Sequence, residues 1–360
     1  MNTGRTLAAL CHGLRGLPVA AADWTPILAA ANRQLLAPAL WVALRASGRA
    51  TELPADVCDY LATLHRLNGD RNRALRRQAI ELIGALNRSG IRPALLKGAI
   101  ALFDGPYADP ATRMMRDLDI LIPGPSRTSA IEAIERLGYV LVKGYGGEHH
   151  AFGDFARPHD PGSVDLHTEL VDPAHLLSAS EVWSRGEPRE TEGVHHITPC
   201  PTDRVLHNLL HAQIHHLGGY YRGELEIQQV FELATLSHEF GSNIDWRFIE
   251  DRMRSHRLAT PLGSYLLAAQ DLFGLAWPLM EAPGRLARLH YRRCKVQWES
   301  PALRWLGVPW GNLRSTFAWH RMRALHGAAG GPLTWRLRHV AKFVAKKGIG
   351  AGFGRLLRVH

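Results

Sequence analysis

The spacing of apolar and polar positions predicts helices at both ends of the chain. Ala, Leu and Arg dominate residues 1–85, as in Ala29–Ala46 and Asp70–Leu86, and Ser89-Gly90 then supplies a typical helix stop. After about residue 200 the chain is expected to be helical again. The predicted helices there are Thr202–Leu217, Glu224–Leu236 and Asp245–Ser255.

Between these ends the pattern changes to short apolar or alternating runs, which are typical of β-strands. Short helices are expected between the strands, at Ala99–Phe103 and from Ser126, which can cap its helix, to Leu137. Residues 91–170 should therefore form an α/β unit of about four strands. The predicted strands are Ile91–Leu96, Asp117–Ile122, Tyr139–Val142 and Ser163–Leu170.

This order of elements predicts an α+β protein in which a small mixed sheet is flanked by helical regions. We expect four regions along the chain. They are an N-terminal helical region at 1–85, an α/β core at 86–175, a helical domain at 176–300 and a basic C-terminal segment at 301–360.

Composition places the chain among ordinary globular proteins. Its 360 residues are 46% hydrophobic and 21% charged, and no run approaches the roughly 18 apolar residues of a membrane span. His12 and Arg15 interrupt the apolar N-terminus, which argues against a signal peptide. The four cysteines form no CxxC pair, so neither a disulfide framework nor a cysteine zinc site is indicated, and we expect a cytoplasmic protein.

The net charge of +10 is concentrated near the C-terminus. Residues 301–360 hold eleven Lys or Arg and no Asp or Glu, so the first 300 residues carry about −1. Within this segment Pro332–Lys347 has the spacing of a basic amphipathic helix. Such a helix can lie on an anionic membrane surface, bind RNA phosphates or pack on its own domain. Residues 332–358 are therefore the expected contact with an anionic partner, and a peripheral position at the inner membrane surface is one expectation.

Two aspartates carry the main chemical signal. Asp117 and Asp119 are two residues apart on a predicted strand, so both carboxylates point to the same side while Leu118 faces the core. Close carboxylates repel each other unless a divalent cation neutralises them. Asp165, on a neighbouring predicted strand, would complete a site for Mg²⁺ or Mn²⁺, and two such ions can assist phosphoryl transfer. A solvated strand end is the alternative interpretation.

A turn that suits a phosphate group precedes these aspartates. Lys97-Gly98 lies where a predicted strand meets a helix, so that backbone N–H groups can approach an anion and Lys97 adds positive charge. Arg113 and Arg116 flank the aspartates and can hold a triphosphate or a leaving pyrophosphate. Lys97, Gly98, Arg113 and Arg116 are therefore the candidate nucleotide-binding residues.

The run LLKGAIALFDGPYADPATRMMRDLDILI, from Leu95 to Ile122, resembles the uncharacterised bacterial nucleotidyltransferase family of the polymerase-β-like superfamily. The common pattern is a Lys-Gly turn, an arginine, an Asp-x-Asp strand and, later, an Asp-Leu-His strand that is seen here in Val164–His167. The resemblance covers roughly residues 65–255 and continues more weakly through His211, His215 and Asp245-Trp246.

This resemblance implies that Asp117, Asp119 and Asp165 bind metal and that Lys97 and Gly98 contact the phosphates of a nucleotide. Many members of the wider superfamily have Gly-Ser or Gly-Gly at the turn, whereas this chain has Lys-Gly-Ala. That difference leaves the choice of nucleotide and the mode of phosphate binding open.

Together these features predict an enzyme that transfers a nucleoside monophosphate from an NTP to an acceptor and releases pyrophosphate. The acceptor can be a small molecule, a peptide or protein, or RNA, since toxin relatives in the superfamily modify tRNA. The other class of function is a non-catalytic nucleotide-binding protein or a scaffold at the membrane surface. A repulsive acid cluster has little use in a binding module, which favours the enzyme.

The remaining candidates each have a structural alternative. His167 points to the same side as Asp165 and can act near the phosphates or hydrogen-bond Asp165. Tyr107 can stack on a base or pack within its loop. Three histidines at a helical spacing of four can bind zinc, contact a ligand or pack in the core, namely His207, His211 and His215. His149-His150 lies in a Gly-rich loop that can cover the site. Four tryptophans are expected in the core or at an interface: Trp305, Trp310, Trp319 and Trp335.

Overall fold

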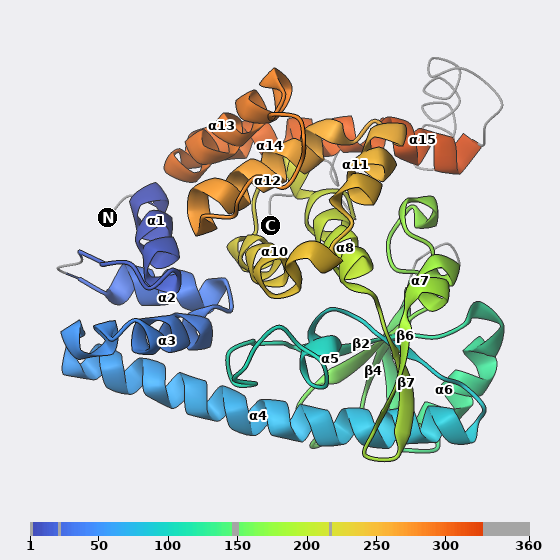
Figure 1. Ribbon diagram of the computed structural model, residues 1–360. Coiled ribbons are helices and arrows are strands. Elements are labelled where there is room, and N and C mark those ends of the chain that lie inside the picture. The colour runs from blue at the N-terminus through green and yellow to red at the C-terminus, as the bar shows by residue number, and fades with distance from the viewer. Residues whose placement is uncertain (1–2, 21–22, 146–150, 216–217, 327–360) are drawn as a thin grey trace.

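The long helix α4 (Ala55–Arg88) joins the N-terminal helices to a β-sheet, and the C-terminal helices pack on the other side of the molecule (Figure 1). This computed structural model describes residues 3–20, 23–145, 151–215 and 218–326. α4 ends at the stop expected from the sequence, because Gly90 adopts a φ of +73° that a helix cannot continue through. The expected α+β class, a mixed sheet between two helical regions, is confirmed.

Seven strands form one mixed sheet in the order β3-β4-β5-β2-β1-β7-β6. β2 is parallel to β5 and antiparallel to β1, and β1 is parallel to β7. The strands are β1 (Ala94–Leu95), β2 (Asp117–Leu121), β3 (Val140–Gly144), β4 (Ala151–Ala156), β5 (Ser163–His167), β6 (Glu187–Thr191) and β7 (Val194–Thr198).

The expectation of about four strands was too small, because it missed β4, β6 and β7. β6 contains Glu187, Pro188 and Arg189 and is exposed, so it lacks the apolar alternation that identifies a strand in a sequence. Its backbone pairs with β7 in a hairpin at the edge of the sheet. The first expected strand, over Ile91–Leu96, shortens to the two residues of β1.

The N-terminal helices are α1 (Thr3–Leu14), α2 (Thr25–Arg33) and α3 (Ala37–Ala46), followed by α4. The single helix expected over Ala29–Ala46 is broken, because Leu35 takes a left-handed φ of +55° between α2 and α3. Beside it, the Gln34 Oε1 accepts a hydrogen bond of 2.9 Å from the backbone N–H of Ile227. This bond ties the break to the C-terminal helices.

Most of the other helices follow the sheet or connect its strands. Ser126 precedes α6 but its side chain makes no capping hydrogen bond, whereas the Asp245 Oδ1 caps α11 by accepting the Phe248 N–H at 2.8 Å. These helices are α5 (Lys97–Ala101), α6 (Arg127–Glu135), α7 (Ala179–Arg185), α8 (Pro201–Gln213), α9 (Gly219–Arg222), α10 (Ile227–Phe240), α11 (Trp246–Ser255), α12 (Ala259–Phe273), α13 (Arg285–Glu299), α14 (Pro301–Thr316) and α15 (Trp319–His326), with 3-10 turns η1 (Arg49–Glu52), η2 (Gly124–Ser126), η3 (Ala174–Leu176) and η4 (Gly241–Asn243).

Two apolar clusters lie on opposite sides of β2. Leu118 and Ile120 pack into the cluster that includes α4, whereas Leu121 belongs to the larger cluster among the helices. Because side chains alternate along a strand, Asp117 and Asp119 point to the same side as Leu121, toward the C-terminal helices. The strand therefore presents both carboxylates to the space between the sheet and these helices.

None of the helices in the described ranges is by itself long and apolar enough to cross a membrane. Taken together, α2 and α3 have the length and composition of a membrane-crossing segment, but they are bent by 119° at the break between them. Trp305 and Trp310 are exposed by 66% and 61%, so they lie outside the core, and a position at an interface stays a prediction for them. The basic helix Pro332–Lys347 with the segment 332–358, His149-His150 and Trp335 lie outside the described residues. The division into four regions stays a prediction.

Candidate active site

Asp119 and Asp165 are direct neighbours on the parallel strands β2 and β5. The pairing of Leu118 with Val164 and of Ile120 with Leu166 buries apolar side chains on the opposite face, and this fixes which residues turn toward the site. The Asp119 side chain is almost wholly buried, whereas Asp165 keeps 17% of its side chain exposed. Two carboxylates from separate strands therefore meet at one place.

His167 connects these two carboxylates. Its Nε2 lies 3.0 Å from the Asp119 Oδ1 and 3.1 Å from the Asp165 Oδ2, and its side chain has no exposed surface. One ligand atom from each of the three residues lies within 4.8 Å of the others, and no second such group of His, Cys, Asp or Glu occurs among the described residues. Asp117 lies on the same side of β2 but is not part of this close group.

Lys97 places a positive charge against the same cluster. Its Nζ donates a hydrogen bond of 2.6 Å to the Asp119 Oδ1. The backbone of Lys97 has a left-handed φ of +45°, which is uncommon for a residue with a side chain. Such conformations persist where the surrounding structure enforces them, and they concentrate at functional sites. Leu35, a second residue of this kind, lines the same cleft.

Charge and burial shift the protonation of these groups in opposite directions. Burial opposes ionisation of Asp119, but the Lys97 ammonium and the His167 hydrogen bond outweigh it and hold the pKa of this carboxyl far below its usual range. Burial and the neighbouring Asp119 charge instead raise the pKa of Asp117 to about 6. Despite burial, hydrogen bonds to Asp119 and Asp165 raise the pKa of His167.

The cluster has the chemistry of a divalent cation site. The Asp165 Oδ1 is buried and has no hydrogen-bond partner among the described residues, although a buried polar atom is normally paired. Two carboxylates and an imidazole supply three ligand atoms, and Mg²⁺ and Mn²⁺ usually complete their coordination with oxygens of solvent or phosphate. Asp119, Asp165 and His167 would hold such an ion, and Asp117 stands next to them on β2.

An open cleft of about 450 Å³ runs along this cluster. It is bounded by the break between α2 and α3, by α5, by the residues before β2 and by the start of α10. All six candidates from the Lys-Gly…Arg…Asp-x-Asp run line it, namely Lys97, Gly98, Arg113, Arg116, Asp117 and Asp119. His211 lines it as well.

The two flanking arginines differ in their surroundings. Arg113 forms a buried ion pair with Glu232 of α10, with an Nη2 to Oε2 distance of 2.8 Å. Arg116 is exposed, and no ion pair to it occurs within the described part of the chain. Gly98 packs so closely that an added Cβ would overlap the Arg113 guanidinium and lie 3.0 Å from the Met115 Cβ. Arg116 is thus the arginine that is free to reach a ligand.

Sequence reasoning missed three residues of α4 that hold the segment before β2. The Asn68 and Asn72 amides both donate to the Arg113 carbonyl, at 3.1 Å and 2.9 Å, and they also reach the carbonyls of Ala111 and Pro110. Arg71 donates to the carbonyls of Met115, Arg116 and Pro161. The available signal was a run of polar residues on the inward side of a helix, at spacings of three and four.

The three regularly spaced histidines form a row beside the cleft. The rings of His207 and His211 are 6.2 Å apart and those of His211 and His215 are 5.5 Å apart. The His215 Nδ1 accepts the Asp172 backbone N–H at 3.1 Å. Burial and the nearby Lys97 lower the pKa of His207 to about 3, so this ring is neutral. Among the described residues these histidines belong to no group with metal-ligand distances.

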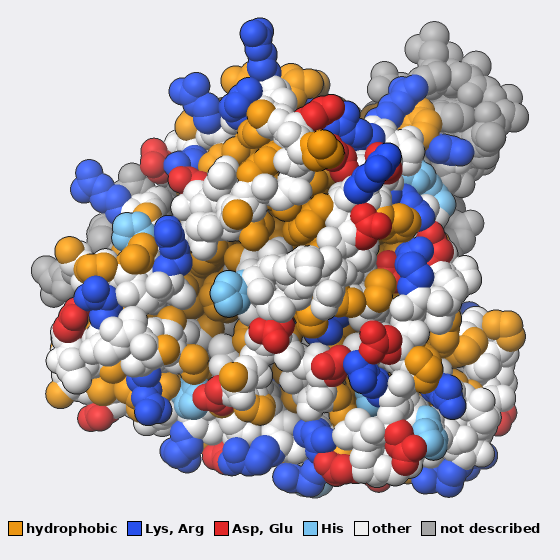
Figure 2. Space-filling view, viewed as in Figure 1, with side chains coloured by type: hydrophobic (Ala, Val, Ile, Leu, Met, Phe, Trp, Pro, Cys, Tyr) orange, Lys and Arg blue, Asp and Glu red, His pale blue; other side chains and the backbone are white. Residues whose placement is uncertain are grey.

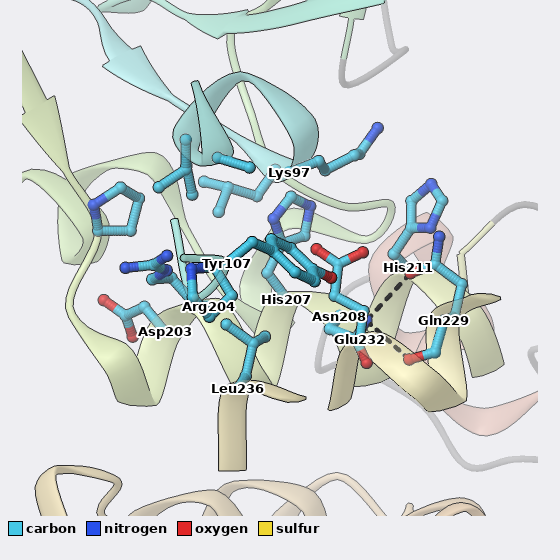
Figure 3. Close-up of a pocket in the computed structure, with 15 residues that line it drawn as sticks. Lys97, Tyr107, Asp203, Arg204, His207, Asn208, His211, Gln229, Glu232 and Leu236 are labelled. Carbon is cyan, nitrogen blue, oxygen red and sulfur yellow. Dashed lines mark hydrogen bonds between the residues drawn. The ribbon is translucent and has the colours of Figure 1, made fainter. Parts of the chain in front are cut away.

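A small cavity of about 30 Å³ lies behind Lys97 (Figure 3). Tyr107, His207 and Glu232 converge on it, and Lys97 and His211 line both this cavity and the open cleft. Its volume suits about two water molecules rather than a nucleobase. Tyr107 therefore packs at the back of the site in this structure.

Comparison with known proteins gives one match. Residues 20–274 match a family described as uncharacterised nucleotidyltransferase. No curated protein and no solved structure matches the chain.

Proposed function

The chain belongs to the uncharacterised nucleotidyltransferase family, and from that premise we propose that it transfers a nucleoside monophosphate from an NTP to a hydroxyl of an acceptor. The oxygen of the acceptor forms a bond with the α-phosphorus, the bond from that phosphorus to the bridging oxygen breaks, and pyrophosphate leaves. The observation that carries the proposal is the meeting of Asp119, Asp165 and His167 directly behind a cleft whose wall includes Asp117 and Asp119.

The side chains of the cluster suit separate tasks in this reaction. Asp165 has an oxygen without a hydrogen-bond partner in the described structure and is the base that accepts the proton of the acceptor hydroxyl. Asp119, Asp165 and His167, with Asp117 next to them on β2, would hold Mg²⁺ or Mn²⁺. Such an ion, when bound, neutralises charge on the phosphates and on the entering and leaving oxygens.

Lys97 and Arg116 are the cations that hold the phosphates. Lys97 pairs with Asp119, and its flexible side chain is 24% exposed at the cleft. Arg116 is exposed and lines the same cleft. Arg113, by contrast, keeps its guanidinium on Glu232, so its role is to fix the wall of the cleft rather than to bind the triphosphate.

We propose a small molecule as the acceptor. A second cavity of about 610 Å³ adjoins the cleft, which is within the usual range for small-molecule sites. Its three arginines, Arg33, Arg222 and Arg304, are largely offset by Glu224 and Glu226, and Glu224 pairs with Arg222 and Arg304 at 2.9 Å and 2.8 Å, so the cavity has too little net positive charge to favour RNA phosphates. Arg33, Gln34, His211 and Glu226 line both spaces.

The test is incubation with each labelled NTP, Mg²⁺ or Mn²⁺ and a bacterial small-molecule extract, with pyrophosphate release as the readout. Asp119→Ala and Asp165→Ala should abolish release, whereas Asp59→Ala, at an exposed carboxylate of α4, should not change it. Equal release by all the variants would refute the enzymatic proposal. Mass spectrometry of tRNA and of proteins from the same reaction would detect the alternative acceptors, and nucleotide binding without release would support a non-catalytic role.

A further inference from the structure

Helix α14 buries small and polar residues and exposes large apolar ones. Its inward face is made of small or polar residues: Gly311, Asn312 and Ser315 are buried, and Val308 is the buried aliphatic residue among them. Gly311 lies against the backbone of Tyr221 so closely that a Cβ would overlap it. A surface helix normally turns its large apolar side chains toward the core, which α14 does not do.

The large apolar residues of α14 form a stripe on the outward face instead. Leu303, Leu306 and Trp310 follow one another at helical spacings of three and four, and they are exposed by 47%, 61% and 61%. Single exposed apolar residues are common on protein surfaces, but an aligned stripe that contains a tryptophan indicates a contact surface.

Helix α13, which packs beside α14, also exposes apolar side chains. Leu289 and Val296 point away from the buried residues of α13 and are exposed by 59% and 48%. Arg285, Arg288 and Arg292 alternate with them, are exposed, and have no ion-pair partner among the described residues. Figure 2 shows Lys and Arg side chains around the end of the molecule where Figure 1 places α13 and α14, with hydrophobic side chains between them.

We propose that the outward face of α13 and α14 docks on the surface of an anionic lipid bilayer. An apolar stripe with a basic surround matches the two layers of such a surface, since the apolar side chains enter the acyl boundary and the arginines meet the headgroups. Tryptophan is favoured at that boundary. Small and polar residues on the protein side let α14 stay attached to α9 while its apolar side faces lipid.

Two other binding partners for this face are less favourable, namely a second copy of the chain and RNA. Arg285, Arg288 and Arg292 are exposed and have no ion-pair partner in the described ranges, so two copies that met through this face would repel each other. RNA would use the arginines but would leave the stripe of Leu303 and Leu306 in water. The proposal does not rest on the catalytic function, because α13 and α14 follow the residues matched by the family and Leu303, Leu306 and Trp310 do not line the cleft.

The experiment is flotation of the full chain with vesicles of phosphatidylcholine alone or of phosphatidylcholine mixed with phosphatidylglycerol. The wild type should float with the anionic vesicles, and Leu306→Ser/Trp310→Ser should lower its partition coefficient on the order of tenfold. Val140→Ser/Val142→Ser, a matched pair at exposed positions of β3, should leave it unchanged. Thermal unfolding should be the same for all three proteins, since both pairs lie at the surface.

A second variant tests the electrostatic part without touching the apolar stripe. Arg285→Gln/Arg288→Gln/Arg292→Gln should weaken binding to the anionic vesicles and make binding less sensitive to salt. Failure of the wild type to float, or unchanged flotation of Leu306→Ser/Trp310→Ser, would overturn the proposal. So would binding to poly(U) in place of vesicles, or a wild-type dimer in lipid-free solution that this double variant dissociates.

Discussion

The buried ion pair between Arg113 and Glu232 allows a direct test of what this arginine does. The Nη2 to Oε2 distance is 2.8 Å and the two side chains are only 10% and 12% exposed. At an effective dielectric constant of about 20, the attraction at this distance is about 6 kcal/mol, and much of it offsets the desolvation of both charges. Removal of one partner leaves the other charge buried without compensation, which costs about 3–5 kcal/mol.

We therefore expect Glu232→Gln and Arg113→Gln each to lower the free energy of unfolding by about 3–5 kcal/mol. The double variant Arg113→Met/Glu232→Leu should lose far less than the sum, because it leaves no unpaired charge. Urea denaturation followed by circular dichroism measures all three. Arg247→Gln is the control, since the Arg247–Asp251 pair is exposed by 90% and 73% and should contribute less than about 1 kcal/mol.

The same variants distinguish a structural arginine from a phosphate ligand. If Arg113 fixes the wall of the cleft, the double variant should retain NTP affinity within about threefold, as measured by titration calorimetry. Full stability of Arg113→Gln together with a large loss of NTP affinity would refute the assignment. In that case Arg113 would leave Glu232 when the nucleotide binds.

Three further changes test the cluster itself. Burial raises the pKa of Asp117 to about 6, so this carboxyl takes up a proton at lower pH and then disfavours a divalent cation. The affinity for Mn²⁺ should therefore fall about tenfold from pH 7 to pH 5. An affinity that does not change with pH in titration calorimetry would contradict this. Lys97→Met removes the ammonium that lies 2.6 Å from the Asp119 Oδ1. Mn²⁺ should then bind more tightly in the absence of nucleotide, while pyrophosphate release should fall. An unchanged Mn²⁺ affinity would show that Lys97 does not compete with the ion. Gly98→Ala should cost about 1–3 kcal/mol, because its Cβ overlaps Arg113; an unaltered melting temperature would mean that the turn has room to adjust.

Patterns along the chain were sufficient to predict the features that depend only on residues close together in the sequence. Period-2 geometry alone puts Asp117 and Asp119 on one side of β2, opposite Leu118, and the turn at Lys97-Gly98 follows from its position after an apolar run. The α+β class and the end of α4 at Gly90 were equally accessible, because they depend on hydrophobic spacing and on the conformational freedom of glycine. The roles of these residues in catalysis stay predictions.

Contacts between distant segments were decided only by tertiary structure. Asp165 stands beside Asp119 because β5 pairs with β2 in one register, and a slip by one residue would turn one carboxylate to the other face. Arg113 meets Glu232, and Asn68 meets the Arg113 carbonyl, across separations of 119 and 45 residues. Likewise, the spacing of Leu303, Leu306 and Trp310 fits a buried stripe as well as an exposed one. The choice is made by close packing, since the glycine face of α14 fits against Tyr221 and leaves the large side chains outside.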